Sequence, residues 1–154
     1  MAATMNYELF MRAALAEAAL AAGEGERADG AVAVLDEAMV ARGRESVRAS
    51  GDPTAHAVMA LLREASRRLG RRWQPGMIVF CAVEPCAMCT GALLQAHVET
   101  VVFALGDPRE GACSSAVRLA DAPGLPHRLR VVSGILQDAA ADLRPDLAIR
   151  AVAR

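Results

Sequence analysis

The chain has 154 residues, of which 54% are hydrophobic and 23% are charged. This balance is typical of one soluble globular domain and excludes a disordered chain, a collagen and a coiled coil. The formal net charge is −1, which argues against general nucleic-acid binding because that binding depends on neutralising phosphates. No segment approaches the roughly 20 apolar residues of a membrane span, and no signal peptide is recognisable, so we expect a cytoplasmic protein.

The first part of the chain is predicted to form a helix and a hairpin. Apolar residues recur at helical spacing over residues 6–22, and residues 30–35 form a short apolar run typical of a buried strand. Asp36 and Glu37 are expected to form a turn into a second strand near residues 39–42. Residues 43–52 are polar and predicted as loop.

A second helix is predicted to start at Asp52, as N-cap, with Pro53 in its first turn, and to end at Gly70. The remaining elements are a strand over 77–83, a helix over about 86–96, a strand over 98–105, a loop-rich stretch over 106–128, a strand over 129–135 and a helix over 137–152 that Pro145 could break. The order of helices and strands predicts a layered α/β arrangement, and we expect one domain over residues 1–154.

Residues suited to metal binding lie at the starts of two predicted helices. Cys86 and Cys89 form a Cys-x-x-Cys pair, and His56 opens the preceding helix. At a helix start both thiolates can face one point, and the helix dipole favours their charged form. Three protein ligands with a fourth position open are typical of a catalytic zinc site.

Two other interpretations of the cysteine pair remain open. A structural zinc site would need a fourth ligand, for which His97, His127 and Cys113 are the spare candidates. A thioredoxin-like redox pair is the second alternative. Pro85 before the first cysteine, together with a histidine about 30 residues upstream, favours the three-ligand site.

These motifs resemble the cytidine and deoxycytidylate deaminase superfamily, which carries His-x-Glu and Pro-Cys-x-x-Cys. The chain is most similar to the branch of bacterial tRNA adenosine deaminases and guanine deaminases. The resemblance covers nearly the whole chain and rests on residues 30–32, 52–57, 84–92, 101–103, 111–112, 127–128 and 134–136. It implies a three-layer α/β/α fold around a five-stranded mixed sheet, a zinc cofactor, a homodimer, and hydrolytic deamination of a purine-like amino heterocycle.

Two positions depart from the family pattern. Val58 stands where the family has its acid/base glutamate, and positioned proton transfer is worth about 10²–10⁴-fold, so activity by the usual route should be small or absent. Glu45 stands where the family has a substrate-contacting asparagine, and it is our candidate for a substitute acid/base. The resemblance also implies that Glu84 orients the site and that the substrate is bordered by Glu45, Ala57, Pro85, Asp107 and Ser114.

Three functions fit this pattern. The chain is a deaminase-family enzyme with altered chemistry, a non-catalytic partner subunit or ligand-binding pseudoenzyme, or an active deaminase whose glutamate was replaced to hold a substrate. A small heterocycle is favoured over tRNA, because the end of the chain at 146–149 lacks aromatic side chains that could stack on bases.

Overall fold

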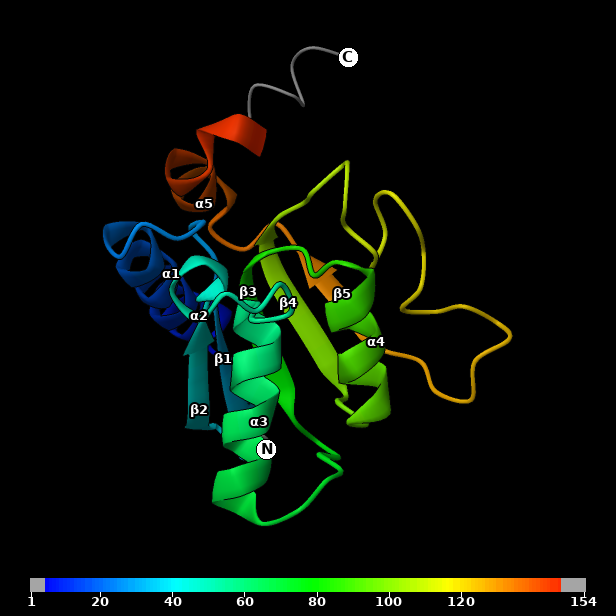
Figure 1. Ribbon diagram of the computed structural model, residues 1–154. Coiled ribbons are helices and arrows are strands. Elements are labelled where there is room, and N and C mark those ends of the chain that lie inside the picture. Colours follow the sequence, from blue (N-terminus) through cyan, green and yellow to red (C-terminus); the bar gives the residue numbers. More distant parts are fainter. Residues whose placement is uncertain (1–4, 148–154) are drawn as a thin grey trace.

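Five short strands form a sheet at the centre of the molecule (Figure 1). The computed structural model describes residues 5–147. The sheet has the order β2-β1-β3-β4-β5, in which β1 is antiparallel to β2 and β3, while β3, β4 and β5 are parallel. The mixed sheet is therefore confirmed. The strands are β1 (Gly30–Leu35), β2 (Ala38–Arg44), β3 (Ile78–Val83), β4 (Thr100–Leu105) and β5 (Arg130–Ser133).

Helices cover both faces of this sheet, which confirms the three-layer architecture. Alternate strand residues point to opposite faces, so Val32 and Phe80 pack beneath α1 (Tyr7–Gly23) and α5 (Gln137–Leu143). Ala33 and Val79 face the other layer. That layer holds α3 (Ala57–Leu69) and α4 (Ala87–Gln95), and the short α2 (Val47–Ser50) precedes α3.

The β1–β2 hairpin is held between two helices at two glycines. A Cβ added at Gly30 would collide with the backbone of α1 at Ala18, and one added at Gly43 would collide with α3 at the Ala57 carbonyl and the Leu61 N–H. Only glycine allows backbone to approach backbone this closely. The turn between the strands is the predicted one, because Asp36 and Glu37 both have positive φ, as a two-residue type I′ turn requires.

The predicted loop over 43–52 and the predicted helix start at Asp52 are wrong. β2 continues to Arg44, and α2 lies within the supposed loop. The next helix begins at Ala57, because the Asp52 carboxylate accepts hydrogen bonds from the N–H and hydroxyl of Thr54 and so stabilises a local turn. The helix ends at Gly70 in left-handed conformation, as predicted.

The last elements are shorter than predicted. β5 spans only four residues, and α5 ends at Leu143 because the chain leaves helical conformation at Arg144, just before Pro145. Helical residues follow at 145–147, and the remainder of the predicted helix, 148–152, lies outside the described residues. Within residues 5–147, no helix is long and apolar enough to cross a membrane.

Candidate metal centre

The three predicted metal ligands come together at two neighbouring helix starts. His56 and Cys86 are the residues immediately before α3 and α4, and Cys89 lies in the first turn of α4. The Sγ atoms of both cysteines lie 3.5 Å from Nδ1 of His56. The three ligand atoms all lie within 4.8 Å of one another, and over residues 5–147 no further histidine, cysteine or carboxylate joins the group.

This geometry fits a tetrahedral zinc ion. Zn–N bonds of about 2.0–2.1 Å and Zn–S bonds of about 2.3 Å separate nitrogen from sulfur by roughly 3.5–3.6 Å at a tetrahedral angle. The observed separations of 3.5 Å match that value. His56, Cys86 and Cys89 are thus a zinc-binding triad, and a tetrahedral ion held by three ligands has one position left for water or substrate.

The two thiols differ in their readiness to ionise. A hydrogen bond from the Cys89 thiol, with further help from His56, lowers the pKa of Cys86 to about 5. The Cys86 partner and burial raise the pKa of Cys89. Of the two thiols, Cys86 is therefore the one that ionises more readily, and both must lose their protons to bind a metal ion.

A buried glutamate next to the triad fixes the loop that follows β4. Glu84 is 3% exposed, and its carboxylate accepts hydrogen bonds from the backbone N–H groups of Asp107, Cys113, Ser114 and Ser115 and from the Ser115 hydroxyl. Five donors leave its oxygen atoms fully engaged. Glu84 therefore anchors residues 107–115.

The other predicted residues of this loop are engaged in its structure. The Asp107 carboxylate accepts the N–H groups of Arg109 and Glu110, which closes a tight turn. The Pro85 carbonyl accepts the Ala112 N–H, which ties the loop to the start of α4. Ser114 is exposed at its side chain and bonded to Glu84 only through its N–H.

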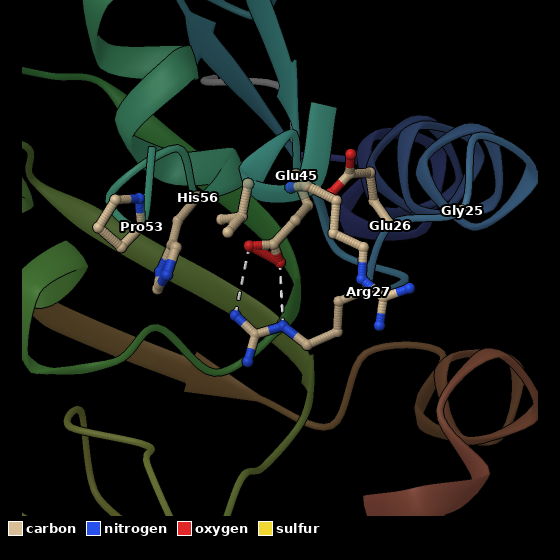
Figure 2. Close-up of a pocket in the computed structure, with 8 residues that line it drawn as sticks. Gly25, Glu26, Arg27, Glu45, Pro53 and His56 are labelled. Carbon is tan, nitrogen blue, oxygen red and sulfur yellow. Dashed lines mark hydrogen bonds and ion pairs between the residues drawn. The ribbon is translucent and has the colours of Figure 1, made fainter. Parts of the chain in front are cut away.

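A cavity of about 410 Å³ opens beside His56 (Figure 2). Glu45 lies on its wall, 2% exposed, at the end of β2. The Arg27 guanidinium donates hydrogen bonds to the Glu45 carboxylate from Nε, at 2.9 Å, and from Nη2, at 3.4 Å. Its Nη1 donates a third hydrogen bond, at 3.4 Å, to the Glu110 carboxylate. The lining comprises Gly25, Glu26, Arg27, Glu45, Val47, Arg48, Pro53 and His56. Of the predicted substrate-bordering residues, this lining contains Glu45 but not Ala57, Pro85, Asp107 or Ser114.

The second carboxylate of the cavity is also engaged. Glu26 accepts the N–H groups of Arg48 and Ala49 at 2.8 Å each, so it caps α2 with its side chain. Val58 is 3% exposed and packs in the apolar core with Cys89. Among the described residues that line the cavity, no carboxylate is without a bonded partner.

Sequence reasoning missed Arg27 and its neighbour Asp29. Burial and the nearby Glu45 charge raise the pKa of Asp29 to about 7. The Glu45 N–H bonds to the Asp29 carbonyl, so the two residues stand side by side where β1 and β2 meet. Arg27 and Glu45 are 18 positions apart in separate loops, and no periodicity or motif links them.

Comparison with known proteins places these features in a family. The pattern described as the cytidine and deoxycytidylate deaminase zinc-binding region matches residues 4–105. A tRNA-specific adenosine deaminase of Aquifex aeolicus (strain VF5) is 36% identical over 126 residues, which are 82% of this chain and 83% of that protein. The guanine deaminase of Bacillus subtilis (strain 168) is 38% identical over 101 residues, 65% of either protein.

The fold comparison agrees with the sequence comparison. A solved structure from biochemical and structural studies of A-to-I editing by tRNA:A34 deaminases superimposes with a TM-score of 0.85 at 36% identity. The alignment covers 88% of this chain and 98% of that chain. With its zinc-binding triad and its five-stranded mixed sheet, this chain belongs to the cytidine and deoxycytidylate deaminase family.

Proposed function

We propose that the protein binds a purine-like amino heterocycle beside its zinc-binding triad and deaminates it hydrolytically, with turnover limited by the residue at position 58. The observation that carries this proposal is the cavity that shares His56 with the triad. Relatives named as tRNA-specific adenosine deaminase and guanine deaminase support the substrate class. The near-neutral net charge favours a small heterocycle over tRNA.

The proton transfers of this reaction need a group that the cavity does not offer freely. Zinc, when bound, lowers the pKa of a coordinated water to about 7 and so supplies a nucleophile at neutral pH. Both cavity carboxylates are occupied, Glu45 by Arg27 and Glu26 by the start of α2. Val58, two residues after His56, has no proton to give or take. Glu45 could act as the base only if Arg27 released it.

The test is to restore a carboxylate at position 58. In zinc-loaded Val58→Glu protein we expect ammonia release from a purine-like base to rise on the order of 10²-fold, the usual size of a positioned acid/base. Val58→Gln is the matched control, because it has the same shape but transfers no proton, and it should stay at the wild-type rate. Measurements use adenine, guanine and their nucleosides.

Other outcomes would redirect the proposal. Unchanged ammonia release in Val58→Glu, combined with complete loss in Glu45→Gln, would make Glu45 the base. Loss in Glu84→Gln protein that keeps its fold and its zinc would assign that role to Glu84 instead. Both results would contradict a limit set by Val58.

A second candidate function is ligand binding without turnover, as a partner subunit or pseudoenzyme. The paired state of both cavity carboxylates favours it. It requires that a purine base bind to the zinc-loaded protein while neither wild type nor Val58→Glu releases ammonia.

We also propose that the protein is a homodimer. A broad hollow of about 570 Å³ between α3 and α4 is lined by both apolar and polar side chains, including Met59, Leu62, Ala92 and Gln95. Covering apolar side chains of this kind is favourable. Sedimentation should give twice the mass of one chain, and Met59→Glu should shift the protein toward monomer.

A further inference from the structure

Arg27 has hydrogen-bond donors that are not used by its two protein partners, Glu45 and Glu110. A guanidinium carries five N–H groups. Nε–H and one N–H of Nη2 point to Glu45, and one N–H of Nη1 points to Glu110. Two donors therefore remain, one on each terminal nitrogen. In Figure 2 the Arg27 side chain runs to Glu45 and ends on the side of the cavity that holds His56.

Glu45 fixes the direction of these donors. The Glu45 side chain is 2% exposed and is held at the end of β2, whereas the Arg27 side chain is 41% exposed. A two-point contact to a buried carboxylate locks the plane of the guanidinium. The guanidinium is therefore held in one plane at the wall of the cavity, which lowers the entropy cost of binding a second pair of acceptors there.

We infer that Arg27 is a specificity-determining residue that selects oxopurines, the guanine type, over aminopurines of the adenine type. This inference rests on the proposed function and names its substrate class. Guanine presents two adjacent acceptors, O6 and N7, whose spacing matches two guanidinium N–H groups. Adenine presents N7 beside the N6 amino group, which is a donor and would face the donors of Arg27.

The alternative, that Arg27 only neutralises Glu45, makes a different prediction. A lysine at position 27 would keep the positive charge beside Glu45 but has no planar fork. Under the alternative, Arg27→Lys would leave ligand preference unchanged. Under our inference, the same variant would lose the preference for the oxo group.

The test compares guanine with 2,6-diaminopurine, which differ in the oxo or amino group at C6 and in the proton on the adjoining ring nitrogen. Binding to zinc-loaded protein is measured by equilibrium dialysis, so that no turnover is needed. We expect wild type to prefer guanine about tenfold or more, the discrimination typical of a two-point arginine contact. Arg27→Lys should reduce the preference to within about twofold of none.

The matched control is Arg42→Lys. Arg42 also pairs with a buried glutamate, Glu17, but lies on β2 outside the cavity lining. It should keep the wild-type preference. Equal binding of both bases by wild type, a preference for 2,6-diaminopurine, or an unchanged guanine preference in Arg27→Lys would overturn the inference.

Failure of the proposed function would have a different signature. That failure is seen when Val58→Glu releases no ammonia, whereas the role of Arg27 is measured by base binding alone. Absence of binding would overturn the role of Arg27 as well. Binding of both bases without preference would overturn Arg27 alone and leave the proposed function in place.

Discussion

Two buried glutamates near the metal centre are satisfied in different ways. Glu84 is 3% exposed and accepts five hydrogen bonds from residues 107–115, four of them from backbone N–H groups. Glu45 is 2% exposed and depends for its ion pair on one side chain, Arg27, which is itself 41% exposed. The first arrangement fixes a loop, and the second holds a long side chain at a cavity.

The difference separates a part of the site that should tolerate little substitution from a part in which a pair of side chains can be exchanged. Backbone donors cannot be replaced by mutation, so the Glu84 side accepts almost no change at position 84. The Glu45 side is a pair of side chains, and both can be exchanged together. The triad connects the two sides, because His56 lines the Glu45 cavity while Cys86 follows Glu84 by two residues.

Zinc removal should have the largest effect on stability, because the ion connects the helix start that carries His56 with the one that carries Cys86 and Cys89. We expect a chelator to lower the free energy of unfolding by about 4 kcal/mol or more, the value for a ligand present at 1,000 times its Kd. Denaturant melts with and without chelator measure this. Cys86→Ser should bind less than one zinc and melt like chelated protein.

Cys113→Ser is the matched control for that experiment. Cys113 is buried beside Thr90 and lies outside the triad, so its serine variant should keep one zinc per chain. A full zinc content in Cys86→Ser would contradict the assignment of the ligands.

Glu84→Ala should have the next largest effect. It leaves four backbone N–H groups without their acceptor, and we expect a loss of about 3 kcal/mol in the free energy of unfolding. Hydrogen exchange at residues 113–115 should accelerate with it. Intact exchange protection in this variant would show that the loop does not depend on Glu84.

Arg27→Ala should cost less, about 2 kcal/mol, because water can partly replace the exposed guanidinium beside Glu45. The double variant Arg27→Met/Glu45→Leu should regain most of this loss, since it removes the buried charge as well. Thermal melts of the two variants measure these changes in stability, which are to be compared with the loss in Glu84→Ala. A double variant that is less stable than Arg27→Ala would show that the two side chains cannot be replaced together.

Asp29→Asn should have the smallest effect, and it should depend on pH. The folded pKa of Asp29, about 7, lies above the ordinary value of 3.8, so its protonated form favours folding and that advantage is lost as pH rises from 4 to 7. The variant should therefore gain stability relative to wild type between pH 5 and pH 8, by at least about 1 kcal/mol, the value of one pKa unit. A gain that is equal at both pH values would contradict the raised pKa.

Sequence patterns identified the parts of the site that are local. His56 and the Cys86–Cys89 pair lie at helix starts, and neighbours in the sequence mark them. The boundaries of β1 and the end of α3 at Gly70 followed from apolar runs and from glycine. The start of α3 did not, because the Asp52 side chain can cap a helix or close a turn, and sequence alone does not decide between these two uses.

The wall of the cavity could not be predicted in the same way. Glu45 was singled out as a departure from a family pattern, but its partner Arg27 comes from another loop 18 residues away. Glu84 was expected to orient the site, while its five donors come from a segment more than 20 residues downstream. Such pairings are created by the sheet order, which brings distant loops to one edge.

Gly43 influences the metal centre without touching it. Any side chain at this position would push against the Ala57 carbonyl and the Leu61 N–H, and so move the first turn of α3, which begins directly after His56. A single methyl group on β2 would thereby shift the histidine nitrogen relative to the two sulfur atoms. The geometry of the triad thus depends on a glycine that lies in the sheet and offers no ligand to the metal.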